Sequence, residues 1–232
     1  MMPPTKPPTY LMINLASWNV RGINSPFKQK EVVNYISSNS IHFFGLLETK
    51  LSSSAYSALQ QKFSRQGSWN FVSNFETHSH GRILLSWNSS IIKSCQVLFL
   101  NPQFIHCSLS TDFYQFQVTT LYAFNQKISR VPLWSDLLNI ALSVQVPWLV
   151  FGDFNSILST QDKFGSNASL RDTEELSHFC SASNLTDIPY TGYRFTWSNR
   201  REISTRCKLD RIMCNSLWMS AFPSSHAIFA NP

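Results

Sequence analysis

The sequence of 232 residues is poor in charge and lacks the features that mark several classes of protein. Only 14% of its residues are charged, and serine and asparagine supply much of the polar surface instead. The five cysteines are odd in number and widely scattered without a CxxC pair, so neither a zinc site nor a disulfide framework is predicted. No apolar run reaches membrane-spanning length, and the Pro-rich start does not resemble a signal peptide. These absences predict a nuclear or cytoplasmic protein that is not secreted.

Length, apolar content and net charge limit the possible domain organisation and the possible partners of the protein. The length fits one large domain or two small ones, and we predict a Pro-rich lead over residues 1–10 and a single domain over residues 11–232. The chain is 43% hydrophobic and 14% aromatic, which is ample for a core. The net charge of +6 favours a polyanionic partner without identifying one.

The stretch from Trp148 to Asn155, WLVFGDFN, carries the clearest pattern in the chain. Its unbroken apolar run predicts a strand buried on both faces, although a buried helical segment has the same pattern. Asp153 and Asn155 are two residues apart, so on an extended chain their side chains point to the same side. Such a pair could orient a water molecule and bind a phosphoryl oxygen. It could equally form only an Asx turn that ends a core strand.

An apolar strand followed by a polar residue recurs at Asn19, Glu48, Tyr122 and Asp210. Asn19 could reach a metal or a phosphate, or merely cap a turn. Glu48 could bind a hard cation such as Mg²⁺, or be solvated or paired with a lysine. Tyr122 could bind a phosphate, or pack in the core. Together with the Asp153–Asn155 pair, these positions favour a site that handles metal or phosphate.

Between these positions the sequence predicts an alternation of helices and strands. Helices are expected over residues 26–37, 53–63, 131–144 and 173–183, the last with Glu174 and Glu175 in its first turn. Strands are expected over residues 11–20, 42–47, 69–72, 82–87, 91–99, 104–110 and 113–122, with further strand-like segments over 191–199 and 206–213. Residues 161–171 are polar and are expected to form a loop.

Five motifs in order, WNVRG, LLETK, LYAFN, FGDFN and KLDRI, resemble those of the endonuclease/exonuclease/phosphatase family, which includes abasic-site endonucleases and pancreatic-type deoxyribonuclease. The further motifs WNVRGINSP, GRILLSWN, GYRFTWSN and LDRIMCN look most like the endonuclease domain of plant LINE-type (non-LTR) retrotransposons. The resemblance runs from Leu11 to about Pro223. It implies an α/β (α+β) fold, a four-layer α/β/β/α sandwich of two mixed sheets.

The same resemblance implies Mg²⁺-dependent hydrolysis of phosphodiester bonds in double-stranded DNA, with Mn²⁺ as an alternative metal and without a membrane or an obligate protein partner. By the motif match, Glu48 is a metal ligand with Asn19 beside it, and Tyr122 and Asn155 hold the scissile phosphate. The match also implies that Asp153 positions or deprotonates the attacking water and that Asp210 orients a catalytic histidine. Thr196 is implied to line the DNA groove.

The sequence departs from the family near its end. The family carries a Ser-Asp-His motif on a late strand, and this sequence reaches Pro232 without one. Ser224-Ser225-His226 lacks the aspartate and follows Asp210 by 16 residues, whereas the family implies roughly two dozen. We interpret His226 as a surface or edge-strand residue, and expect a domain that lacks its catalytic histidine and its last one or two strands and is impaired in nicking.

Three functions remain open from the sequence. The first is a retrotransposon-derived DNA endonuclease, and the second is a family phosphatase acting on a small phosphate ester or a phosphoinositide. The third is a non-catalytic remnant that binds nucleic acid. The motifs GRILLSWN and GYRFTWSN count against the phosphatase.

Overall fold

The structure is a computed structural model that describes residues 12–77, 82–199 and 204–230. The predicted lead over residues 1–10 lies outside the described residues. The chain divides into two compact units, Met1–Phe116 and Gln117–Pro232. Among the described residues the strands form two larger mixed sheets, one of four and one of six strands, and two small sheets. The predicted mixed α/β fold with two mixed sheets is confirmed.

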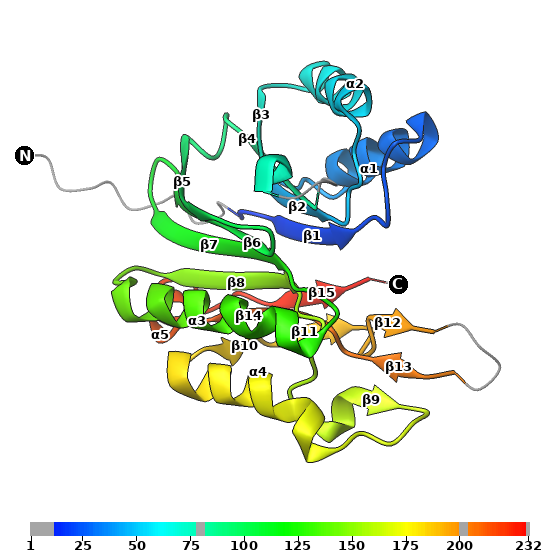
Figure 1. Ribbon diagram of the computed structural model, residues 1–232. Coiled ribbons are helices and arrows are strands. Elements are labelled where there is room, and N and C mark those ends of the chain that lie inside the picture. The colour runs from blue at the N-terminus through cyan, green and yellow to red at the C-terminus, as the bar shows by residue number, and fades with distance from the viewer. Residues whose placement is uncertain (1–11, 78–81, 200–203, 231–232) are drawn as a thin grey trace, which may run out of the picture. The chain divides into compact units, whose positions relative to one another are not determined.

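The first unit is built on a four-stranded sheet in the order β1-β2-β4-β3 (Figure 1). β1 (Leu15–Asn19) is parallel to β2 (Phe43–Leu47), and β4 (Ile83–Asn88) is antiparallel to both β2 and β3 (Trp69–Ser73). The crossover that parallel strands require is α1 (Pro26–Ser38), and α2 (Ser53–Ser64) links β2 to β3. A short helix, η1 (Phe75–Thr77), and an antiparallel pair, β5 (Ser94–Leu100) and β6 (Phe104–Ser110), complete this unit.

The core of the first unit lies between these two helices and the sheet. Val32, Val33 and Ile36 of α1 form one buried cluster with Leu59 and Phe63 of α2. Phe63 stacks on Phe44 of β2 with ring centroids 5.2 Å apart. This burial accounts for the helices, because the apolar side chains repeat every three or four residues in each of them.

In the second unit four strands follow the order β10-β14-β8-β7. β7 (Gln115–Tyr122) is parallel to β8 (Trp148–Asp153), and α3 (Lys127–Ser143) is the crossover between them. β14 (Asp210–Cys214) is antiparallel to β8 and to β10 (Thr186–Asp187). α3 lies beside α4 (Leu170–Ser183), as Figure 1 shows, with the rings of Trp134 and Phe179 5.2 Å apart.

Short elements complete the second unit. They are η2 (Thr160–Asp162), α5 (Ser216–Ala221), a small sheet of β9 (Lys163–Phe164), β13 (Arg206–Cys207) and β12 (Trp197–Ser198), and a parallel pair of β11 (Tyr190–Gly192) and β15 (Ala227–Phe229). Two-residue strands make few backbone hydrogen bonds, so other contacts must hold them in place. Buried Arg211 pairs with Asp162 of η2 and with Asp187 of β10. The ammonium group of Lys208 lies 3.8 Å from the centre of the Tyr190 ring.

Most predicted elements are present, and the errors lie at their ends and in short elements that were not predicted. Residues 161–171 were expected to be a loop, but they contain part of η2, all of β9 and the start of α4. Because α4 begins at Leu170, the prediction that Glu174 and Glu175 lie in its first turn is wrong. Asp172 is there instead and forms a capping box with Ser169. The helix predicted from residue 131 begins at Lys127, and the strand predicted from residue 91 begins at Ser94.

None of the described helices is both long and apolar enough to cross a membrane.

Candidate active site

Three neighbouring strands of the second unit place predicted site residues side by side. Tyr122 at the end of β7 is in register with Asp153 at the end of β8, and Asp153 is in register with Asp210 at the start of β14. Residues directly opposite each other on paired strands point to the same face of a sheet. The structure therefore brings Tyr122, Asp153 and Asp210 together on one face at one edge of this sheet.

The turn after β8 fixes Asp153 and Asn155. Asp153 is 7% exposed, and its Oδ1 accepts a hydrogen bond of 3.0 Å from the backbone N–H of Asn155. This hydrogen bond forms the Asx turn, which was one of the two interpretations that the sequence allowed for Asp153 and Asn155. Asn155 has a left-handed backbone, with φ of 45°, and its side-chain amide donates to the carbonyl oxygen of Ala123 at 2.8 Å. The turn thus connects the loop after β8 to the end of β7.

Thr196 supports the start of β14. Its Oγ1 accepts hydrogen bonds from the backbone N–H groups of Leu209 (3.1 Å) and Asp210 (3.0 Å). This contact fixes the backbone that carries the Asp210 carboxylate. The sequence did not predict this contact, and the role of Thr196 in a DNA groove stays a prediction.

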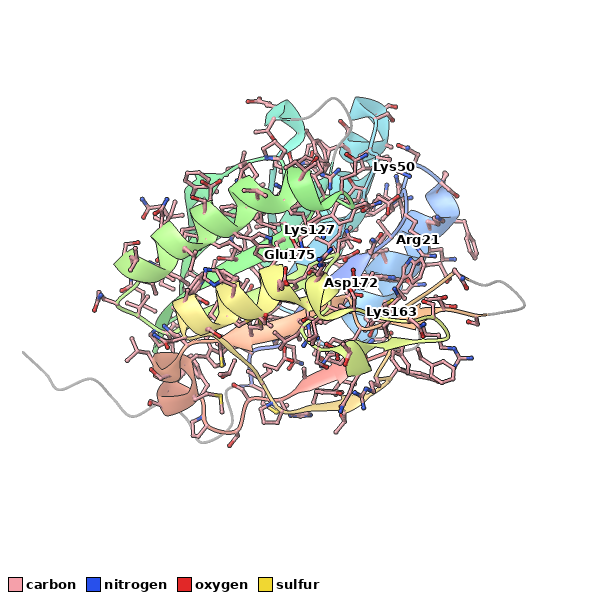
Figure 2. All side chains as sticks on the ribbon, turned by 60° about the horizontal axis from the view of Figure 1, so that its bottom comes forward. Arg21, Lys50, Lys127, Lys163, Asp172 and Glu175 are labelled. Carbon is pink, nitrogen blue, oxygen red and sulfur yellow. The ribbon has the colours of Figure 1, made fainter. Side chains whose placement is uncertain are left out.

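In the first unit, Asn19 and Glu48 lie at the carboxyl ends of two adjacent parallel strands. Asn19 is in register with Leu47, the residue before Glu48. The Glu48 carboxylate lies 2.7 Å from the Lys50 ammonium group, and Asn19 Oδ1 accepts a hydrogen bond of 3.2 Å from the backbone N–H of Arg21. Figure 2 labels Arg21 and Lys50, which come from the segments that follow β1 and β2.

The donor atoms at this strand edge suit a hard cation. A carboxylate and an amide oxygen are ligands that Mg²⁺ accepts, and Mg²⁺ usually keeps several water molecules rather than filling its shell from the protein. Across residues 12–77, 82–199 and 204–230 no group of three or more His, Cys, Asp or Glu side chains is arranged to hold a metal. Glu48 and Asn19 offer oxygen ligands from two side chains, so a Mg²⁺ ion held by them would keep several water molecules.

Cysteine thiols are poor candidates for the chemistry. Burial raises the pKa of Cys180 to about 12 and that of Cys214 to about 11. Burial likewise raises the pKa of Cys207. The pKa of Cys107 is also raised, by its hydrogen bond with Cys95 first and by burial second. These thiols are protonated at neutral pH, and only the thiolate is a good nucleophile or metal ligand.

A family model described as "Endonuclease/Exonuclease/phosphatase family" matches residues 16–230, nearly the whole chain. The chain belongs to the endonuclease/exonuclease/phosphatase family. All five motifs that carried the resemblance overlap the matched residues. A comparison with curated proteins gave no match.

Solved structures with the fold of this endonuclease/exonuclease/phosphatase chain include proteins with distinct activities. The endonuclease domain of TRAS1, a telomere-specific non-LTR retrotransposon, has a TM-score of 0.63 at 9% identity, over 88% of this chain and 86% of its own. The 3′ phosphatase NExo from Neisseria, bound to a product DNA hairpin, has a TM-score of 0.69 at 15% identity, over 90% and 89%. A β-hairpin deletion mutant of beta toxin from Staphylococcus aureus has a TM-score of 0.64 at 12% identity, over 95% and 92%. At these identities the similarity shows the fold alone.

His226 is the last residue that was considered in the sequence of this endonuclease/exonuclease/phosphatase family member. It is exposed and directly precedes β15, whose first residue, Ala227, is in register with Tyr190 of β11. This position agrees with the interpretation of His226 as a surface residue next to an edge strand.

Proposed function

We propose that this protein is a metal-dependent DNA endonuclease of the non-LTR retrotransposon type, which nicks DNA by hydrolysing phosphodiester bonds. One observation carries the proposal: Asp153 lies in register between Tyr122 and Asp210, within a chain that the family model matches almost end to end. Two carboxylates and a phenol on adjacent strand ends can bind a water molecule and a phosphate group at the same time. The relatives described as a retrotransposon endonuclease and a DNA 3′ phosphatase support DNA as the substrate.

Each residue of the cluster has a role that follows from its chemistry. Asp153 accepts a proton from the attacking water, whose oxygen forms the new bond to phosphorus as the bond to the leaving oxygen breaks. Tyr122 and Asn155 donate hydrogen bonds to the phosphoryl oxygens. The negatively charged Asp210 carboxylate orients a group that carries a proton. Thr196 fixes the position of Asp210, because its hydroxyl accepts a hydrogen bond from the backbone N–H of Asp210.

Glu48 and Asn19 would hold Mg²⁺ through oxygen atoms, as their donor chemistry allows. When bound, the metal would supply charge stabilisation for the phosphoryl group. Lys50 competes for the same carboxylate, because its ammonium group already lies 2.7 Å from Glu48 Oε1. Metal binding at this edge therefore requires the Lys50 side chain to move or to share the carboxylate.

The test of the proposal is nicking of supercoiled plasmid by the purified chain. We expect conversion to the open circle with Mg²⁺, and no conversion when EDTA removes the metal. Glu48→Ala should weaken Mg²⁺ binding in calorimetry without unfolding the protein, since Glu48 is only partly buried. Glu31→Ala, an exposed acid on α1, is the matched control and should bind Mg²⁺ as the wild type does.

Measurements of phosphate release and of DNA binding, made beside the nicking assay, separate the alternatives. Release of inorganic phosphate from a 3′-phosphorylated oligonucleotide or a soluble phosphate ester, without nicking, would replace the endonuclease with a phosphatase. DNA binding without either reaction would identify a non-catalytic binding protein. Equal Mg²⁺ affinity in Glu48→Ala and the wild type would remove Glu48 from the ligand set.

A further inference from the structure

A buried ion pair lies between α3 and α4, outside the residues assigned to the reaction. The guanidinium group of Arg130 pairs with the carboxylate of Glu175, and the two side chains are only 7% and 8% exposed. Figure 2 shows Glu175 on α4, on the side toward α3. Burying two opposite charges is costly unless further hydrogen bonds satisfy them, so such a pair is weak evidence for stability by itself.

The hydrogen bonds of the Glu175 carboxylate reach beyond its partner arginine. Its Oε1 accepts from Arg130 Nε at 3.1 Å and from the Ser156 hydroxyl at 3.0 Å, and its Oε2 accepts from Trp134 Nε1 at 3.0 Å. Ser156 directly follows Asn155. One side of the pair is therefore attached to the loop after β8, which carries Asn155 and directly follows Asp153.

Arg130 attaches the same pair to the loop after β7. Its NH1 group donates to the carbonyl oxygens of Phe124 and Asn125, each at 2.8 Å. These residues follow Tyr122 by two and three positions. The third link is the bond from the Asn155 side chain to the carbonyl oxygen of Ala123. The two loops are thus joined to each other and to the buried pair.

We propose that Arg130 and Glu175 are positioning residues that hold these two loops, and through them Tyr122, Asp153 and Asn155, in the geometry needed for turnover. The inference rests on the proposed function for its kinetic part, whereas the attachment of the loops stands on the contacts alone. A guanidinium group suits this task because its planar fork bonds a carboxylate on one side and carbonyl oxygens on the other, which a lysine cannot do. Loops that carry reacting groups need such rigid support.

The first test changes each partner conservatively. Glu175→Gln keeps the shape but removes the charge, and Arg130→Lys keeps the charge but removes the fork. We expect the nicking kcat of each to fall about 10- to 100-fold while KM for DNA changes by less than about 2-fold, because small displacements of reacting groups act on turnover. Glu174→Gln, the same change at an exposed position of α4, should leave both constants unchanged.

The second test separates positioning from folding. Arg130→Met combined with Glu175→Leu removes both charges, so its unfolding midpoint should recover relative to the single variants. Its kcat should stay low, because the carbonyl oxygens of Phe124 and Asn125 still lack a donor. Recovery of kcat together with stability would overturn the proposal and leave the pair a purely structural one.

Hydrogen exchange tests the attachment independently of activity. In Glu175→Gln we expect faster backbone exchange in residues 123–125 and 154–156 than in the wild type, with no such change in Glu174→Gln. Unchanged exchange in both loops would overturn the proposal. Faster exchange in a protein whose wild type does not nick DNA would support the attachment and refute the endonuclease function.

Discussion

Gly152 is the residue on which the placement of Asp153 depends most directly. Its φ of +134° is a conformation that side chains disfavour, and a Cβ atom built there would lie 2.1 Å from the carbonyl oxygen of Leu121. That oxygen belongs to β7, the strand parallel to β8. The close approach of the two strands next to Asp153 is therefore possible only with glycine.

Gly152→Ala should destabilise the protein by more than about 3 kcal/mol, because backbone strain of about 1–3 kcal/mol adds to a clash with main-chain atoms that cannot move freely. Gly67→Ala is the matched control, since Gly67 has a similar φ of +130° but nothing within 4 Å of the added atom. Its cost should stay within the strain alone. Denaturant unfolding of both variants measures the difference, and equal costs would show that the approach of β7 is not what requires Gly152.

The strands that position the candidate site could be predicted from the sequence where burial alone determines their residue pattern. All six residues of β8 are buried, and the unbroken apolar run WLVF reflects burial on both faces of the sheet. β2 is likewise buried throughout. Glu48, Asp153 and Asn155 could be placed from the sequence, because each lies at the end of its buried strand or within two residues after it.

Other elements depend on contacts that no local pattern reveals. β9 has two residues, too few for a periodicity, and its place is set by pairing with β13 about forty residues later. α3 begins before Pro132, a residue that argues against a helix interior. Arg130 and Glu175 are 45 positions apart, so their pairing could not be predicted from spacing. The register that joins Asp210 to Asp153 is equally non-local.

His42 gives the first sheet a pH dependence. The imidazole Nδ1 of His42 accepts a hydrogen bond of 3.1 Å from the backbone N–H of Asn14, and the backbone N–H of His42 donates to the Asn14 carbonyl oxygen at 2.8 Å. Burial lowers the pKa of His42 below 6.5. As pH falls, the unfolded chain therefore binds a proton before the folded protein does. The stabilisation is complete above pH 6.5 and is lost as pH falls through the lowered pKa.

We expect the urea midpoint to fall between about pH 7.5 and about pH 5, and the fall to be smaller in His42→Leu. His178→Leu is the control, because His178 is exposed on α4 and its loss should leave the pH dependence of the wild type. An NMR titration of His42 gives the direct check. A His42 pKa at or above the ordinary value would contradict the burial argument.

For the whole molecule, the net charge agrees with the kind of partner proposed above. The net charge of +6 favours a polyanion, and DNA, the substrate proposed above, is a polyanion. Charge alone is not specific, so in the proposed function the distinction between binding and cutting DNA depends on the carboxylate that lies between Tyr122 and Asp210. We propose that Asp153 performs the proton transfer of phosphodiester hydrolysis.

Nicking by Asp153→Asn tests this claim most directly. The asparagine keeps an oxygen that can accept the Asn155 N–H bond, so the turn should persist while the base is lost. We expect the single-turnover rate with Mg²⁺ to fall about 10²- to 10⁴-fold, and Asp112→Asn, at an exposed acid in the loop between β6 and β7, to cut as the wild type does. Nicking by Asp153→Asn at the wild-type rate would contradict the account.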